Sequence, residues 1–338
     1  MKTKSVLLAL ALLATATPCL ADGEVNVYTS RKEALILPLF DRFTELSGIE
    51  VRILSANAGA LISRLESEGR NSPADVLLTV DAGNLHRARE AGVLRTTTSA
   101  ALESAIPTTY RDPEGYWFGL SQRARVIFRS TERVGADAID SYADLADPTI
   151  KGSLCIRSSS NIYNQSLVAS MIASDGEEAT ETWARGVVAN MARPPQGGDT
   201  DQLRAVAAGA CDLAVANTYY YGRLLGSDSE DDRAVGEQVA IVWPDQSGRG
   251  AHVNVSGAGI TTHSPNPDNA LALLEFLAGE EAQAWYAEMN HEFPVREGVA
   301  PTSVLASWGP FDADDINLSE LGKHNAAAVR LMDRAGWR

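Results

Sequence analysis

The constraint that most narrows the possible fold is a regular alternation of strand and helix patterns over residues 25–91. Apolar runs alternate with amphipathic stretches in the order strand 25–28, helix 33–46, strand 50–54, helix 60–68, strand 75–80 and helix 82–91. Such alternation predicts parallel strands joined by right-handed crossovers. In open sheets of this type, ligands bind beyond the carboxyl ends of the strands. We therefore expect residues 28–31, residues 55–57 and Asp81 at a ligand-binding edge.

The first residues have the pattern of a secretory signal peptide. Lys2 and Lys4 precede the apolar stretch 6–16, and the small-residue exit 18–21 suggests cleavage after Ala21. Lipid attachment at Cys19 is the alternative, although the usual upstream leucine is missing. Cleavage removes two lysines and leaves 27 basic against 44 acidic residues, a net charge of −17. Such acidity disfavours binding to nucleic acid, and we expect a monomer exported to the periplasm.

The remainder predicts a second α/β unit. Its expected elements after the bridging strand 117–129 are 153–157, 164–174, 176–191, 200–208, 211–216, 239–244, 252–262, 269–277, 280–289 and 317–335, with 227–237 as an acidic surface loop. The exported chain is too long for one ordinary hydrophobic core. We predict a first lobe of residues 22–122 and 248–300 and a second lobe of residues 123–247 and 301–338. The fold class is α/β, a two-lobed solute-binding protein of type II with a hinge of crossing strands.

Cysteine usage predicts one disulfide. Of three cysteines, an exported chain keeps Cys155 and Cys211, and an even pair in an oxidising compartment favours a bridge. The alternative is two buried thiols acting as small apolar groups. Each cysteine lies eight residues before a tyrosine, Tyr163 or Tyr219, so a bridge would tie together the far ends of two strands that lead to one site.

Three consecutive tyrosines, Tyr219, Tyr220 and Tyr221, follow the apolar run 213–216 in a chain with nine tyrosines in all. A phenolate is a hard, anionic oxygen ligand that suits a hard metal cation. Free tyrosine ionises only near pH ~10, so the cation must be strongly positive, and a trivalent metal ion fits. The alternative is that these are strand tyrosines that bury their rings and leave the hydroxyls in water.

Several motifs together resemble the ferric-ion-binding periplasmic proteins that serve ABC transporters. In chain order they are Val-Tyr-Thr-Ser-Arg (27–31), Asn-Ser-Pro-Ala-Asp-Val (71–76), Trp-Phe-Gly-Leu-Ser-Gln-Arg-Ala-Arg-Val (117–126), Ser-Ser-Ser-Asn-Ile-Tyr-Asn-Gln-Ser (158–166), Ala-Asn-Thr-Tyr-Tyr (216–220) and Gly-Arg-Gly-Ala-His-Val-Asn (248–254). The pairing of Ser-Asn-Ile-Tyr-Asn with Asn-Thr-Tyr-Tyr is the specific element. The resemblance implies ferric iron as the ligand and an inner-membrane ABC permease as the partner.

By this resemblance Tyr163, Tyr219 and Tyr220 are the iron ligands. Tyr221 is left out, because strand geometry would point it to the opposite side. Another branch of the family adds a histidine and a glutamate, but residues 29–32 contain no histidine and Val80 stands where the glutamate would fall. The resemblance is therefore to the branch whose protein ligands are all tyrosines.

Three phenolates leave an octahedral ion half-coordinated, and in the all-tyrosine branch carbonate, held by arginine, completes it. Arg31 and Arg123 are the candidates for this anion, since a guanidinium grips a planar oxyanion through paired hydrogen bonds. An ion pair is the alternative for each. Arg125 is expected on the other face of its strand, and Tyr28 is interpreted as a core residue more readily than as a ligand. His252 is interpreted as a hydrogen-bonded residue of the crossover strand.

No enzyme motif is present: the chain lacks His-Glu-x-x-His, Gly-x-Ser-x-Gly and a phosphate-binding loop. We therefore predict a binding protein and not an enzyme. Two alternatives stay open at this point. One is a binding protein for a small anion held by Arg31 and Arg123, with the tyrosines as walls. The other is an exported enzyme built on the same scaffold.

Overall fold

The computed structural model describes residues 23–338. The expected signal peptide, residues 1–21 with Cys19, lies outside the described residues. Within residues 23–338, none of the helices has both the length and the apolar character needed to cross a membrane.

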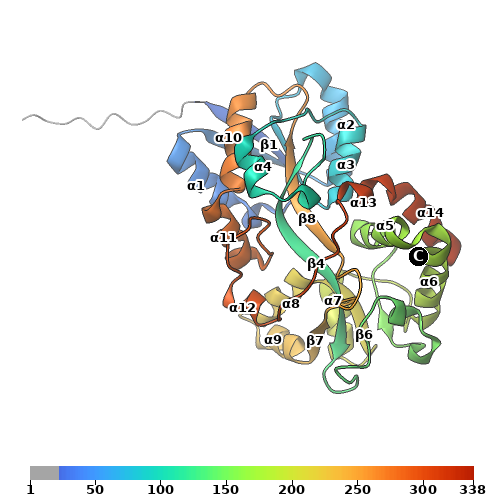
Figure 1. The fold of residues 1–338 in the computed structure, drawn as a ribbon. Coiled ribbons are helices and arrows are strands. Elements are labelled where there is room, and N and C mark those ends of the chain that lie inside the picture. The colour runs from blue at the N-terminus through green and yellow to red at the C-terminus, as the bar shows by residue number, and fades with distance from the viewer. Residues whose placement is uncertain (1–22) are drawn as a thin grey trace, which may run out of the picture.

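The first lobe carries parallel strands, as the alternation in the sequence predicts (Figure 1). Strand β1 pairs in parallel with β2 on one side and with β3 on the other. Its elements are β1 (Glu24–Thr29), α1 (Leu37–Ser47), β2 (Glu50–Ser55), α2 (Ala58–Glu68), β3 (Val76–Val80), α3 (Ala82–Glu90), α4 (Ala100–Ala105), β8 (Val253–Ile260), α10 (Pro267–Leu277) and α11 (Glu280–Asn290).

The expected helix 33–46 is broken. A 3₁₀ turn over Glu33–Leu35 is followed by α1, which starts at Leu37 with Pro38 in its first turn. Proline lacks an N–H and its ring clashes with the carbonyl four residues earlier, so one continuous helix through Pro38 is unfavourable. The chain restarts the helix where proline is tolerated.

The second lobe contains the tyrosine motifs and most of the remaining helices (Figure 1). Together with the C-terminal segment it comprises β5 (Leu154–Cys155), α5 (Ile162–Asp175), α6 (Glu177–Asn190), α7 (Asp199–Ala207), β6 (Leu213–Asn217), α8 (Thr218–Leu225), α9 (Glu230–Glu237), β7 (Val239–Val242), α12 (Ser303–Ala306), α13 (Ser319–Lys323) and α14 (Asn325–Ala335). Two hydrophobic clusters form its core, one on each side of the sheet that β4, β5 and β6 share.

Two sequence expectations for this lobe are wrong. The acidic stretch 227–237 contains a helix, α9, because Ser229 caps it and three acidic residues in its first turn interact favourably with the helix dipole. The expected C-terminal helix 317–335 is two helices, α13 and α14, separated at His324. They serve different cores, since Leu321 packs in the first-lobe cluster and Leu331 in the second.

One strand, β4 (Phe118–Ser130), belongs to both lobes. Its first half pairs with β8 of the first lobe, and its second half pairs with β6 and β7 of the second. The strand order through the molecule is β2-β1-β3-β8-β4-β6-β5, with β7 also on β4. Strands β4 and β8 therefore form the crossing that connects the lobes, and the two-lobed α/β fold is confirmed.

Candidate metal centre

The three candidate ligands lie at the amino ends of two helices. Tyr163 is in the first turn of α5, and Tyr219 and Tyr220 are in the first turn of α8. Asn161 caps α5 through a 3.1 Å bond from the Tyr163 N–H to its side-chain oxygen. Because a helix carries partial positive charge at its amino end, both helices favour anionic oxygen at this place.

The tyrosine side chains meet one another. The Tyr219 hydroxyl donates a 3.2 Å hydrogen bond to the Tyr163 hydroxyl, and the rings of Tyr219 and Tyr220 lie 4.3 Å apart between centroids. Tyr219 is buried, whereas Tyr163 and Tyr220 are half-buried. The structure thus brings together two residues that are 56 positions apart, Tyr163 and Tyr219, as the motif pairing requires.

Burial keeps the phenols of Tyr163 and Tyr219 protonated in the absence of a cation. Loss of solvent, with a smaller contribution from Tyr220 and against the opposing effect of Arg123, raises the pKa of Tyr163 to about 12. Burial also raises the pKa of Tyr219 well above its usual value. A cation that binds here must therefore displace phenolic protons.

Tyr221 does not follow the strand geometry assumed for it, because the three tyrosines are on a helix. Its ring packs against Phe128, at 5.3 Å, and Trp308, at 5.7 Å, and its hydroxyl donates to the Val239 carbonyl at 3.4 Å. Tyr221 therefore contacts the aromatic core of the second lobe, while Tyr219 contacts Tyr163.

Arg123 is a buried cation whose two terminal nitrogens have no hydrogen-bond partner within residues 23–338. Its guanidinium carbon lies 5.9 Å from the centre of the Tyr163 ring. A buried guanidinium is costly unless its donors are satisfied, so it is suited to receive an oxyanion. Arg223 adds a second positive charge, 4.8 Å from the centre of the Tyr219 ring.

Arg31, the other candidate for an anion, is engaged. Its Nη2 atom forms a buried ion pair with Glu292 at 2.5 Å, and Ser121 donates to the same carboxylate oxygen at 2.8 Å. This ion pair is the alternative that the sequence left open for Arg31. The Arg31 Nε atom has no hydrogen-bond partner in the part of the chain that the structure describes.

The expectation that Arg125 faces away from Arg123 is wrong. Side chains two positions apart on a strand share a face, and both guanidinium groups lie 5.9 Å from the Tyr163 ring centre. Arg125 donates to Asn164 at 3.0 and 2.7 Å, to Asn217 at 3.0 Å and to Asp199 at 3.1 Å. It therefore connects the starts of α5 and α8, and the period of the strand was the signal that could have found it.

Tyr28 and His252 differ in their relation to the site. The Tyr28 hydroxyl bonds to the Glu68 carboxylate at 3.0 Å and its ring belongs to the first-lobe core, so the core interpretation is confirmed.

His252 lies just before β8 and lines a narrow cavity with Arg123 and Tyr163. Its backbone is hydrogen-bonded on both sides, and burial lowers the pKa of its ring well below the usual value.

The other potential metal ligands are scattered. Over residues 23–338, histidine, cysteine, aspartate and glutamate side chains form no group of three that could hold a metal ion.

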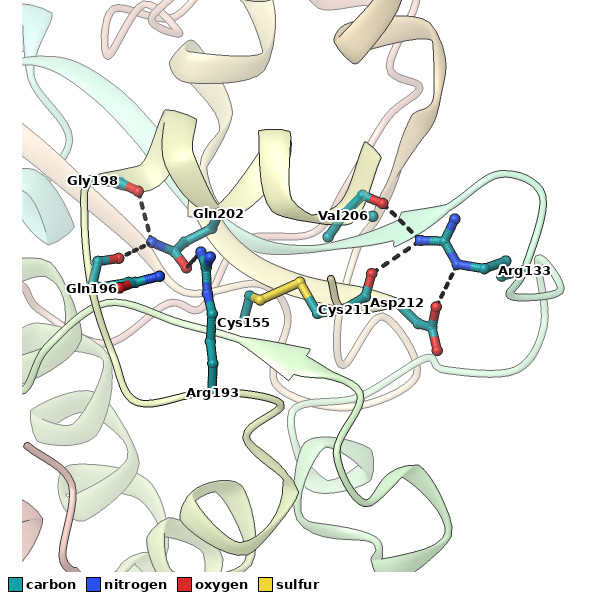
Figure 2. The surroundings of a disulfide bond; sticks show 9 residues. All are labelled: Arg133, Cys155, Arg193, Gln196, Gly198, Gln202, Val206, Cys211 and Asp212. Atoms are coloured by element: carbon teal, nitrogen blue, oxygen red, sulfur yellow. Dashed lines mark hydrogen bonds and ion pairs between the residues drawn. A yellow bond between two sulfur atoms is a disulfide. The ribbon is translucent and has the colours of Figure 1, made fainter. Parts of the chain in front are cut away.

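The predicted disulfide is present and joins the starts of the two segments that lead to the tyrosines. Cys155, at the end of β5, is bonded to Cys211, two residues before β6, with 5.9 Å between Cα atoms. Figure 2 shows Arg133 beside the bridge, where it donates to the carbonyls of Val206 and Cys211 at 2.7 and 3.0 Å. Strand β5 is shorter than the expected 153–157, but it pairs in parallel with β6, so both strands run toward the tyrosine-bearing helices.

Comparison with known proteins places this geometry in a family context. The family model described as "Bacterial extracellular solute-binding protein" matches residues 38–313. "Iron uptake protein A1" of Synechocystis sp. is 47% identical over 315 residues, which cover 93% of this chain and 88% of that protein.

Two solved structures are similar over nearly their whole length. A Trichodesmium protein in complex with iron and citrate superposes with a TM-score of 0.91 at 48% identity, covering 94% of this chain and 100% of that one. The ferric iron-binding protein A of Mannheimia haemolytica, in an open conformation, gives a TM-score of 0.87 at 45% identity, with 93% and 99% covered.

Proposed function

Because the chain belongs to the bacterial extracellular solute-binding proteins, we propose that it captures ferric iron in the periplasm and delivers it to an ABC permease of the inner membrane. The family consists of binding proteins and not of enzymes. Several of the similar proteins are named for iron uptake or ferric iron binding, which supports iron as the ligand here.

The protein ligands that we propose are the phenolates of Tyr163, Tyr219 and Tyr220. The observation that carries this assignment is the convergence of their side chains at two helix amino ends, with 3.2 Å between the hydroxyls of Tyr163 and Tyr219. Three phenolates balance the charge of Fe³⁺, and phenolate oxygen matches the preference of a hard cation. The helix ends and the nearby guanidinium groups stabilise the anionic form of each phenol.

We propose that a carbonate or bicarbonate ion completes the coordination and is held by Arg123. Both terminal nitrogens of Arg123 are buried and unpaired among the described residues, so an oxyanion would satisfy donors that otherwise lack partners. Arg31 could bind the anion only while it also bonds to Glu292, because its Nη2 atom is already paired with that carboxylate at 2.5 Å. Arg123 is therefore the first choice and Arg31 the second.

The same unpaired guanidinium supports a second candidate function, the binding of a small anion with the tyrosines as walls. The two functions differ in colour, since a phenolate bound to Fe³⁺ gives a visible charge-transfer band and an anion complex gives none. Metal analysis and a visible spectrum of protein purified from the periplasm separate them. We expect iron near one equivalent together with the band.

Substitution of the tyrosines tests the ligand assignment. Tyr219→Phe combined with Tyr220→Phe removes two anionic donors while the rings remain, so iron binding should weaken by several orders of magnitude and the band should be lost. Tyr221→Phe is the matched control, because Tyr221 is on the same helix but contacts Phe128 and Trp308. Wild-type colour and affinity in the double variant would refute the assignment.

A further inference from the structure

Asp81 is held in an unusual conformation at the end of a first-lobe strand. It follows β3 and caps α3, and it has φ 83° and ψ 124°, a region that residues other than glycine rarely adopt. Its N–H donates to the Val255 carbonyl at 2.9 Å, and the next N–H, of Ala82, donates to the Asn254 side chain at 2.8 Å. Both of these contacts come from β8, so the crossing strand fixes the position of Asp81.

The Asp81 carboxylate, which has no exposed surface, reaches across to the second lobe. Its Oδ1 atom accepts from the Gly83 N–H at 2.9 Å and from the Ser166 hydroxyl at 2.6 Å. Ser166 is on α5, three positions after Tyr163, and is also fully buried. A hydroxyl that donates to a buried carboxylate forms a short, strong hydrogen bond, and its geometry ties two helices of different lobes together.

The packing around this bond leaves little freedom. A Cβ atom added to Gly83 would lie 3.4 Å from the Ile162 side chain and 3.5 Å from the Ser166 hydroxyl, so the first turns of α3 and α5 are in direct contact. Helix α13 packs against both α3 and α5. The start of α5, which presents Tyr163, therefore rests on a surface supplied by the first lobe.

We infer that Asp81 is a positioning residue for the iron site: through Ser166 it fixes the helix that carries Tyr163 and so makes retention of the metal depend on contact between the lobes. Where the inference concerns iron it rests on the proposed function. Asp81 also lines the narrow cavity that Arg123 and Tyr163 share, but the inferred role is indirect and acts on Tyr163 through Ser166 and helix α5.

Ser166→Ala tests the inference, with Ser170→Ala as the matched control. Ser170 is a buried hydroxyl on the same helix, but its hydrogen bond, to the Leu167 carbonyl at 2.8 Å, stays within that helix. Release of iron to a competing chelator should be roughly tenfold faster in Ser166→Ala and unchanged in Ser170→Ala, in line with the usual worth of a hydrogen bond to a charged group. The charge-transfer band should shift only in Ser166→Ala.

A conservative variant separates positioning from charge. Asp81→Asn keeps an oxygen for both Ser166 and Gly83, so release should stay within about threefold of wild type, whereas Asp81→Ala should resemble or exceed Ser166→Ala. Equal release rates and spectra in Ser166→Ala and Ser170→Ala would overturn the inference.

A readout without iron keeps the inference distinct from the proposed function. Amide hydrogen exchange of the metal-free protein should become faster over residues 81–85 and 162–166 in Ser166→Ala but not in Ser170→Ala. If the wild-type protein bound no iron while this difference persisted, the proposed function would fail and the contact between the lobes would stand. If exchange in the two variants were the same, the positioning role would fail.

Discussion

Replacing Arg125 is the most informative perturbation, because one buried guanidinium holds the starts of both tyrosine-bearing helices. Its nitrogens bond to Asn164, which follows Tyr163 directly, and to Asn217, which ends β6 just before α8. The same group pairs with Asp199, a carboxylate with no exposed surface. Asp199 in turn accepts from the Asn217 N–H at 2.9 Å.

The expected loss of unfolding free energy follows from the buried polar groups that each variant leaves without a partner. Arg125→Lys keeps the charge but offers one nitrogen in place of three, so it cannot keep all four hydrogen bonds and should leave one or two buried acceptors unsatisfied. With about 1–3 kcal/mol for each buried polar group left unsatisfied, we expect unfolding to become easier by about 2–4 kcal/mol. Arg125→Met also removes one of the two guanidinium partners of Asp199, and Arg157, at 3.4 Å, remains as the other. Breaking a buried ion pair completely costs about 3–5 kcal/mol, so we expect a loss near the lower end of that range.

Iron binding should weaken in both variants. Loosening the helix starts lets the phenols of Tyr163 and Tyr219 separate in the free protein, and the ordering cost then falls on binding. If ordering the helix starts makes the free energy of iron binding less favourable by about 1.4–2.8 kcal/mol, the iron affinity falls roughly 10- to 100-fold. Denaturant unfolding measures the first quantity, and chelator competition followed by the visible band measures the second.

Arg129→Lys is the control, since Arg129 is four positions further along β4 and, within residues 23–338, its hydrogen bonds go to the Ser130 and Val134 carbonyls. It should lose about 1 kcal/mol or less and keep the iron affinity. Wild-type stability and affinity in Arg125→Lys would refute the argument, and if Arg125→Met alone were impaired, charge and not geometry would be the contribution of Arg125.

Two further predictions concern protons and the disulfide. Burial holds the pKa of Tyr163 at about 12 and raises that of Tyr219, so iron binding should release about one proton for each phenol. The iron affinity should therefore fall as the pH is lowered, by up to roughly tenfold per proton per pH unit. Equal proton release in Tyr219→Phe and in the wild-type protein would contradict this. Replacing Cys155 and Cys211 by serine should lower the unfolding free energy by about 4 kcal/mol, because the bridge spans 56 positions and restricts the entropy of the unfolded chain. Two free thiols counted in denatured, unreduced wild-type protein would show that no bridge forms.

Features that depend on local sequence pattern were predicted better than features that depend on contacts between distant segments. The parallel strands 25–28, 50–54 and 75–80 follow from apolar runs bounded by helices, and the structure has them within a residue or two. The disulfide was predictable because an exported chain retains only two cysteines. Both rest on properties that a sequence carries directly.

The misses have physical reasons. The tyrosines were assigned to the end of a strand, but the chain turns into α8 at Thr218, a change of backbone direction that the polar dipeptide Asn217-Thr218 permits without marking uniquely. The roles of Arg125 and Asp81 depend on which segments meet across the sheet and between the lobes. Those contacts join residues 39 to 92 positions apart, which no local period encodes.

The order of the strands has a consequence for how the molecule assembles as it is made. Strand β8 (Val253–Ile260) lies between β3 and β4, so the first lobe cannot close its sheet until late in the chain, whereas β4, β5 and β6 are all available once Asn217 has emerged. Pairings between distant segments form slowly and leave strand edges exposed in the meantime. A chain that emerges amino end first can therefore pair β4, β5 and β6, which lead to the tyrosines, before β7 and the C-terminal helix α14 complete the second lobe. It also passes through a stage with a bare edge on β3 that it must protect from other chains.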